Sequence, residues 1–449
     1  MNSFDQFNLK RQLKNAIDDL GFDTPTPIQA QTYSVVRSGK DLVGIAQTGT
    51  GKTLAYLLPI LEGMEFSKDL NPKVLILVPT RELVQQVVDQ AEDLAKYMTI
   101  RVLGVYGGAN INTQAISLSK GVDILVATPG RLYDLALAKA FHVKGLKKLV
   151  IDEVDVMLDL GFRPQLTNIM EIIPDKRQNI MFSATMTDHV DVIIDDFFRA
   201  PEKISAAVSG TPLENIDQES YTVENFYTKV NLLKHLIKDK EQFKKVLVFV
   251  GEKRNADRVF DALYAEMKNE VAVIHSNKSQ NYRFRSIEEF DAGKNRVLVS
   301  TDVMARGLDL EKITHVINFD TPKFPENYMH RIGRTGRAEH KGHTILFSTE
   351  AELNYKNTIE ELMGQKIQLL DFPADVEVSK ELIPEERPKE VEINTGAKIK
   401  ASKNSAFHEK KEKNKKVNEG GSYKKEIAKK YKKPQTRGDK TYHKKKKRG

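Results

Sequence analysis

Two polar stretches of this chain have the residue types of a nucleoside triphosphate site. The first, AQTGTGKT at residues 46–53 (the phosphate loop), follows an apolar run and ends in Lys52 and Thr53. In a glycine-rich turn that opens a helix, backbone N–H groups face the phosphates, the lysine reaches the β- and γ-phosphates, and the threonine hydroxyl binds Mg²⁺. Ala46 replaces the first glycine of the usual G-x-x-x-x-G-K-[ST] pattern, so the interpretation needs independent support.

The second stretch supplies this support. The apolar run LKKLVI ends in Asp152, Glu153, Val154 and Asp155. At the end of a strand, Asp152 can hold a metal ion while Glu153 polarises the attacking water. We therefore expect ATP and Mg²⁺ as cofactors, rather than an ordinary turn followed by a helix N-terminus.

Phe22 and Gln29 lie upstream of the phosphate loop and could read an adenine base. An aromatic ring can stack on the face of the base, and an amide can both donate to and accept from its edge. Taken alone, such residues are more often ordinary core and surface residues, so this prediction depends on the other motifs.

Three motifs between the two stretches suit contact with a sugar-phosphate backbone: PTREL (79–83), Gly107 with Gly108, and TPGR (128–131). Each combines a helix start or a tight glycine with a hydroxyl or guanidinium group. Capping boxes and turns are the alternative, and the shared position after successive apolar runs favours backbone binding. The next motif, SAT (183–185), could hydrogen-bond Asp155 and report the state of the ATP site, or could be a simple turn.

The second half contributes STDVMARGLDL (300–310) and HRIGRTGR (330–337). If the latter is helical, Arg334 and Arg337 share one face and can both point at a γ-phosphate. Arginine fingers of this kind accelerate hydrolysis by roughly 10³ to 10⁵. A solvated basic helix is the alternative.

The elements that must position these residues alternate between short apolar runs and longer helical patterns. The runs are DLVGIA, KVLILVPT, VLGVYGG, DILVAT, KKLVIDE and NIMFSAT in the first half, and KKVLVFV, VAVIHS, RVLVSTD, THVINFD and HTILFS in the second. This alternation predicts parallel sheets with helices on both faces. It is interrupted by SGTPLENIDQES and then resumes, which indicates two α/β domains of similar kind. We expect a first domain at 1–208, a linker at 209–220, a second domain at 221–370, an acidic linker at 371–397, and a tail at 398–449.

Composition restricts the remaining possibilities. The 449 residues include no cysteine, 40% are hydrophobic and 29% charged, and no apolar stretch approaches the roughly 18 residues that cross a bilayer. We expect a soluble, cytoplasmic protein without membrane contact. Residues 398–449 hold 21 Lys or Arg against 5 Asp or Glu, a net +16, whereas the rest holds 49 against 57, a net −8. Such a tail should be disordered and should tether RNA nonspecifically; a solubilising tail or a nuclear address in KKKKR are the alternatives.

AQTGTGKT, PTREL, TPGR, DEVD, SAT, STDVMARGLD and HRIGRTGR occur in the order and spacing of the DEAD-box RNA helicases. The chain resembles this family from Phe4 to about residue 348. The resemblance implies two tandem RecA-like domains that use ATP to unwind or remodel RNA locally. It also implies roles for individual residues, which fall into five groups.

By that likeness, Phe22 and Gln29 bind adenine; Thr48, Gly49, Thr50, Gly51, Lys52 and Thr53 bind phosphate; and Asp309 binds the ribose. Thr53 and Asp152 hold Mg²⁺. Catalysis is assigned to Lys52, Asp152, Glu153, Arg334 and Arg337. Coupling between the domains is assigned to Asp155, Ser183, Thr185 and His330. RNA contacts are assigned to Arg81, Gly108, Thr128, Arg131, Gln280, Arg283, Thr301 and Arg306.

Three features depart from the family pattern. Val154 replaces the usual alanine, but its side chain needs only to pack, so activity should survive. Ser276 follows His275 where relatives commonly have glycine, which affects the local RNA contact. The absence of tryptophan means that base stacking cannot be the main source of affinity, so backbone contact must dominate.

The sequence therefore predicts an ATP hydrolase that couples RNA-stimulated hydrolysis to local unwinding or ribonucleoprotein remodelling. A nucleotide-locked RNA clamp that seldom turns over is the rival, and a DNA-directed motor is a third candidate. We expect a monomer. Motifs that touch only the backbone encode neither the physiological RNA nor the protein partners.

Overall fold

The computed structural model describes residues 3–47, 49–205, 216–302, 310, 312–335 and 341–387. Four residues that the resemblance assigns to the site lie outside the described residues: Thr48, Arg306, Asp309 and Arg337. The same holds for positions 209–215 of the expected linker and for the whole basic tail.

The first sheet has seven parallel strands in the order β3-β4-β2-β5-β6-β1-β7. The six apolar runs that the sequence assigns to this domain all form strands. β7 was not predicted, because its residues are mostly exposed and polar. The strands are β1 (Leu42–Ile45), β2 (Val74–Leu77), β3 (Val102–Val105), β4 (Ile124–Ala127), β5 (Lys148–Ile151), β6 (Gln178–Ser183) and β7 (Glu202–Ser205).

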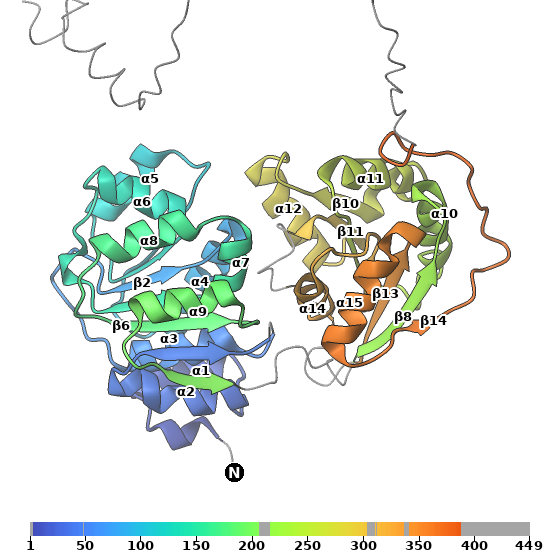
Figure 1. Ribbon diagram of the computed structural model, residues 1–449. Coiled ribbons are helices and arrows are strands. Elements are labelled where there is room, and N and C mark those ends of the chain that lie inside the picture. The colour runs from blue at the N-terminus through green and yellow to red at the C-terminus, as the bar shows by residue number, and fades with distance from the viewer. Residues whose placement is uncertain are drawn as a thin grey trace, which may run out of the picture. The chain divides into compact units, whose positions relative to one another are not determined.

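Helices cover both faces of this sheet (Figure 1). Successive residues of a strand point to opposite faces, so Leu75 and Ile76 of β2 belong to different core clusters. Helices α1 to α4 pack on the face of Ile76, and α5 to α9 pack on the face of Leu75. The helices are α1 (Arg11–Asp19), α2 (Pro27–Ser38), α3 (Lys52–Glu62), α4 (Arg81–Leu94), α5 (Ile111–Ser119), α6 (Pro129–Leu137), α7 (Val154–Asp159), α8 (Arg163–Ile172) and α9 (Asp188–Phe197).

The second sheet repeats the topology of the first. Its order, β10-β11-β9-β12-β13-β8-β14, is that of the first sheet with every strand replaced by the one seven places later. All of its pairs are parallel. The prediction of two tandem α/β domains with parallel sheets is confirmed. The strands are β8 (Ile216–Thr222), β9 (Val246–Phe249), β10 (Val271–Ile274), β11 (Val297–Ser300), β12 (His315–Asn318), β13 (Gly342–Ser348) and β14 (Gln368–Leu369).

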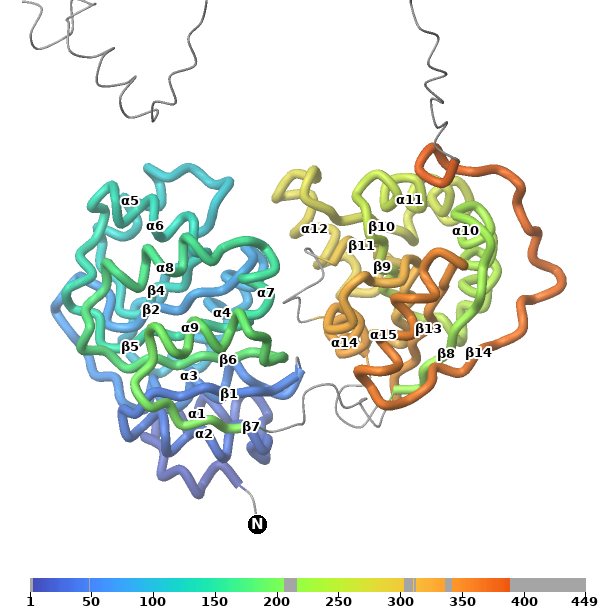
Figure 2. Tube along the Cα trace, in the orientation of Figure 1, coloured from blue at the N-terminus to red at the C-terminus, as the bar shows by residue number. Residues whose placement is uncertain are grey.

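Helices again pack on both faces, as the trace in Figure 2 shows. α10 and α11 lie on the face of Val246 and Val248, and α12 lies on the face of Leu247. α14 and α15 share a further cluster with Leu346 of β13. These helices are α10 (Phe226–Leu236), α11 (Lys253–Met267), α12 (Gln280–Asp291), α14 (Pro325–Ile332) and α15 (Leu353–Met363). Within the described ranges, no helix is both long and apolar enough to cross a membrane.

Parts of both expected linkers belong to the second domain. Residues 216–220 are not linker but the start of β8, where Ile216 and Ser220 are buried and the strand pairs with β13 along its whole length. The polar residues between them concealed the strand. The described part of the acidic stretch, 371–387, packs on the second domain through the buried Val376 and Ile383.

Backbone and side-chain bonds hold this acidic segment in place. Asn225 donates to Ser379 O at 2.5 Å, and Ser379 N donates to the Thr228 hydroxyl at 3.0 Å. The Glu386 carboxylate accepts from Phe226 N at 2.7 Å, at the first turn of α10. We name residues 371–387 the C-terminal strap.

Candidate functional site

The topology brings three of the predicted motifs to one edge of the first sheet. β6 lies between β5 and β1 and pairs with both in parallel. The carboxyl ends of these strands carry the phosphate loop after β1, Asp152 after β5, and the SAT residues after β6. Open parallel sheets bind ligands at this edge.

The phosphate loop requires its glycines. Gly49 and Gly51 have φ of +83° and +82°, in the left-handed region that glycine adopts without strain. A Cβ on Gly51 would lie 2.3 Å from Gln29 Nε2. Gly51 caps α3, whose first residue is Lys52. The expected strand, turn and helix are all present.

Helix α2 braces this loop. The Thr26 hydroxyl donates to Thr50 O at 2.8 Å, and Gln29 Nε2 donates to Gly51 O at 3.2 Å. Gln29 Oε1 accepts from Thr26 N at 2.9 Å, which completes the cap of α2. Gln29 therefore supports the phosphate loop itself, and the exposed Phe22 ring remains available for stacking, with 45% of its surface accessible. Adenine reading by these two residues stays a prediction.

Three charged side chains at the sheet edge each carry a polar atom that has no hydrogen-bond partner among the described residues. Lys52, Asp152 and Glu153 are 7%, 2% and 5% exposed. Among the described residues, none offers a hydrogen bond to Lys52 Nζ, Asp152 Oδ1 or Glu153 Oε2. Burying charged groups unpaired is costly, and such exceptions indicate an external ligand. A lysine beside two carboxylates fits a triphosphate with a divalent cation.

The backbone at Glu153 is itself unusual. Glu153 has φ +54° and caps α7 in the left-handed conformation. A non-glycine residue there costs on the order of 1 kcal/mol or more, and such residues concentrate at functional sites. Val154, the departure from the family pattern, is fully buried in the core beneath the site.

The environment of Asp152 disfavours its charge. Burial raises the pKa of the Asp152 carboxyl to about 6; the neighbouring Glu153 adds to the shift, and Lys52 opposes it. A cation at Asp152 would remove this cost, because it favours the ionised carboxylate.

Asp155 is the most fully hydrogen-bonded carboxylate of the site. Its Oδ2 accepts from Ala184 N at 3.2 Å, Thr185 N at 3.1 Å and the Thr185 hydroxyl at 3.0 Å. His330 Nε2 lies 3.4 Å from the same oxygen. Burial alone would raise the pKa of Asp155, but the bonds from His330 and Thr185 hold it below its usual range. The Ser183 hydroxyl does not join this group and donates instead to Thr185 O at 2.6 Å.

The predicted RNA-contact residues of the first domain lie in the turns and first helical turns that follow the neighbouring strands β2, β3 and β4. Arg81 opens α4, and a Cβ on Gly108 would lie 2.1 Å from its Nη1. Thr128 caps α6. Arg131 donates to Ala109 O at 3.0 Å and to Gln114 Oε1 at 2.7 Å, which joins TPGR to the segment after Gly108. Their contacts with RNA remain a prediction.

In the second domain, α12 begins with Gln280 and carries Arg283. Gln280 accepts from Arg81 at 3.2 Å and donates to Glu82 Oε1 at 2.9 Å, and Arg283 forms an ion pair with Glu82. Sequence reasoning assigned no role to Glu82, although it lies in the PTREL motif. Thr301 directly follows β11, as expected.

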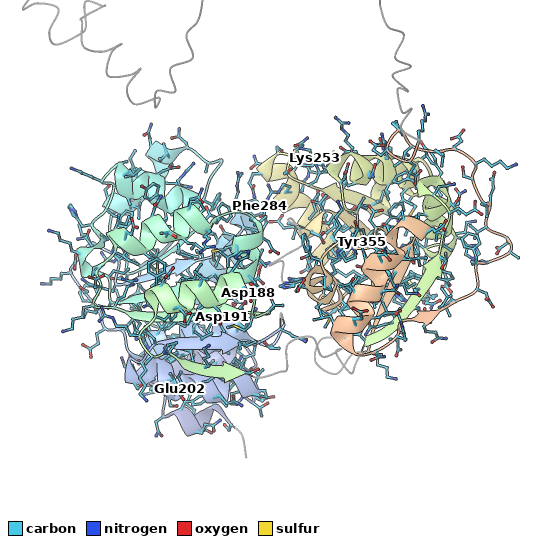
Figure 3. All side chains as sticks on the ribbon, in the orientation of Figure 1. Asp188, Asp191, Glu202, Lys253, Phe284 and Tyr355 are labelled. Atoms are coloured by element: carbon cyan, nitrogen blue, oxygen red, sulfur yellow. The ribbon has the colours of Figure 1, made fainter. Side chains whose placement is uncertain are left out.

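The segment before α12 tolerates the serine that replaces glycine. Ser276 is not among the described residues with positive φ, so glycine is not required for the backbone. His275 Nδ1 accepts from Asn277 N at 3.3 Å, and Lys253, labelled in Figure 3, donates to Asn277 Oδ1 at 3.1 Å. The turn that leads into Gln280 is therefore held from α11.

The helix that begins HRIGRTGR does not reach Arg334. α14 ends at Ile332, Gly333 caps it, and Arg334 lies buried in the following turn. Arg337 lies outside the described residues, so its pairing with Arg334 at a γ-phosphate stays a prediction. Sequence reasoning also missed Arg331, which is buried and binds Asp302 with Nε at 2.5 Å and Nη2 at 2.8 Å. No pattern in the sequence pairs these two residues.

Comparisons with known proteins agree with this geometry. Residues 26–193 match the DEAD/DEAH box helicase family, and residues 228–339 match the helicase conserved C-terminal domain. The chain is 38% identical to the ATP-dependent RNA helicase CshA of Listeria monocytogenes, over 83% of this chain and 71% of that protein. It is 39% identical to the ATP-dependent RNA helicase RhlB of Pseudomonas syringae, over 81% of this chain and 93% of that protein. The structure is similar to S. cerevisiae Dbp5 bound to RNA and ADP BeF3, with a TM-score of 0.77 and 28% identity. The match covers 84% of this chain and 96% of that chain.

Proposed function

This chain belongs to the DEAD-box ATP-dependent RNA helicases, and we propose that it couples RNA-stimulated ATP hydrolysis to unwinding of short duplexes or remodelling of ribonucleoproteins. The observation that carries the proposal is the set of buried, unpartnered groups on Lys52, Asp152 and Glu153 at the edge of the first sheet. This is the arrangement that a triphosphate and its cation would complete.

Within this site, Lys52 would bind the β- and γ-phosphates, and Thr53 and Asp152 would hold Mg²⁺. The cation supplies positive charge against the charge that develops in the transition state. Glu153 would orient the attacking water and take its proton. The Asp152-Glu153-Val154-Asp155 variant should remain active, because Val154 only packs in the core.

The remaining roles concern nucleotide and domain coupling. Phe22 and Gln29 would bind adenine, Asp309 the ribose, and Arg334 with Arg337 the γ-phosphate. Asp155 lies beside both Thr185 and His330, so it would connect the SAT motif to the second domain. Because hydrolysis needs groups from both domains, RNA and ATP should each raise the affinity for the other by the same factor.

RNA would be held through its sugar-phosphate backbone. Guanidinium groups, hydroxyls and helix N-termini position a strand without reading its bases. The groups available are those of Arg81, Gly108, Thr128, Arg131, Gln280, Arg283, Thr301 and Arg306. We propose that one copy of the chain suffices, since these roles need no second copy. No described feature favours the nucleotide-locked clamp.

ATP turnover with and without RNA tests this function, together with displacement of strands from duplexes of increasing length. Glu153→Gln should lower turnover by roughly 10² or more, because the base is lost while the fold is kept. The exposed Glu202→Gln, labelled in Figure 3, is the matched control for loss of one carboxylate. A rate indifferent to RNA, or full turnover by Glu153→Gln, would contradict the proposal. Equal stimulation by DNA would favour the DNA-directed motor.

A further inference from the structure

Tyr56 lies one helical turn beyond Lys52 and Thr53 in α3, and its side chain is completely buried. Its ring packs beside Phe182 of β6, with ring centroids 5.7 Å apart. The phenol is therefore fixed between α3 and the strand that separates β1 from β5. Nothing in the motifs assigned so far gives this residue a role.

The Tyr56 hydroxyl contacts a residue that would hold the cation. It donates to Asp152 Oδ2 at 3.1 Å. A phenol has one proton, so this bond uses the only donor of the side chain.

The oxygen that accepts this bond matters for a metal ligand. When Asp152 Oδ2 is occupied by Tyr56, Asp152 Oδ1 is left as the oxygen without a partner among the described residues. Groups that orient metal ligands in this way raise metal affinity by roughly 10- to 100-fold.

We propose that Tyr56 is a positioning residue for the divalent cation: its hydroxyl holds Asp152 Oδ2 and so presents Asp152 Oδ1 to the cation in its binding orientation. The proposal rests on the Mg²⁺ site of the proposed function. It concerns the affinity and placement of the cation, not a step of the hydrolysis.

The test is Tyr56→Phe in the full chain, which removes one oxygen and keeps the buried ring. ADP affinity is measured with a fluorescent ADP analogue, first in excess EDTA and then at increasing Mg²⁺. In EDTA the variant should bind ADP within twofold of the wild type. The Mg²⁺ concentration that half-saturates the tightening of ADP binding should rise by roughly 10-fold.

Tyr328→Phe is the matched control, because it removes another fully buried phenol hydroxyl, bonded to Gln218 at 2.9 Å in the second domain. Its Mg²⁺ dependence should equal that of the wild type. Unfolding midpoints in EDTA show whether each variant is folded. Asp152→Asn gives the reference for loss of a ligand, and adding Tyr56→Phe to it should change the Mg²⁺ dependence little, because the carboxylate that Tyr56 orients is already gone.

An unchanged half-saturating Mg²⁺ concentration in Tyr56→Phe overturns the positioning role while leaving the proposed function intact. A full additive effect in the double variant also overturns it, because Tyr56 would then act independently of Asp152. If wild-type ADP binding itself is insensitive to Mg²⁺, both the positioning role and the proposed metal site fail.

Discussion

The Asp152 carboxylate should destabilise the nucleotide-free protein, so Asp152→Asn should stabilise it near neutral pH. Burial raises the pKa of this carboxyl from an ordinary 3.8 to about 6. Each unit of this difference corresponds to roughly 1.4 kcal/mol, so ionising Asp152 in the folded protein costs about 3 kcal/mol. Between these two pKa values, the folded state keeps a proton that the unfolded state has released.

Stability of the wild type should therefore fall as the pH rises from about 4 to about 6, and should not change further through this group above pH 6. Asparagine does not titrate. The stability difference between Asp152→Asn and the wild type should grow over the same interval and reach at most about 3 kcal/mol, less whatever the unpartnered amide costs.

Urea unfolding of the full chain between pH 4 and pH 7.5, without nucleotide or Mg²⁺, measures this difference. The exposed Asp195→Asn in α9 is the control for loss of one carboxylate. Saturating Mg²⁺ and ATP should reverse the order of stability, because binding stabilises the wild type by mass action. A variant that is less stable than the wild type at pH 7, or a difference that does not change with pH, would refute the reasoning.

Three further predictions concern stability elsewhere. Burial lowers the pKa of His315 to about 4. The free energy of unfolding should therefore fall by up to about 3 kcal/mol as the pH falls from 6.5 to 4, because the unfolded state takes up a proton that the folded state does not. His315→Gln should abolish this pH dependence in urea unfolding. A chain ending at residue 387 should unfold at the same temperature as the full chain. A chain ending at residue 370 should lose about 3 kcal/mol or more of unfolding free energy, measured by calorimetry, because it lacks the buried Val376 and Ile383. Thr185→Val should cost about 2 kcal/mol of unfolding free energy, because it removes a bond to the buried Asp155 carboxylate; no loss would contradict that bond.

Local patterns were sufficient for features that depend on residues close together in the sequence. All eleven apolar runs form strands. The prediction succeeded because strands of a parallel sheet are buried on both faces and are therefore continuously apolar. The phosphate loop and the acidic stretch identified their chemistry from residue type and spacing alone. Polarity misled the prediction at β8 and in the C-terminal strap, because each depends on a few buried apolar residues within a polar segment.

The tertiary structure decided everything that depends on which segments become neighbours. No spacing in the sequence places β6 between β1 and β5, yet this order brings Lys52, Asp152 and Thr185 to one edge. Nor does a pattern pair Arg331 with Asp302, or Tyr56 with Asp152. The sequence by itself determined the kinds of chemistry and the fold class, because these follow from local composition and periodicity. The partners of each buried charge came only from the folded chain, because residues far apart in sequence meet only through the packing of strands and helices.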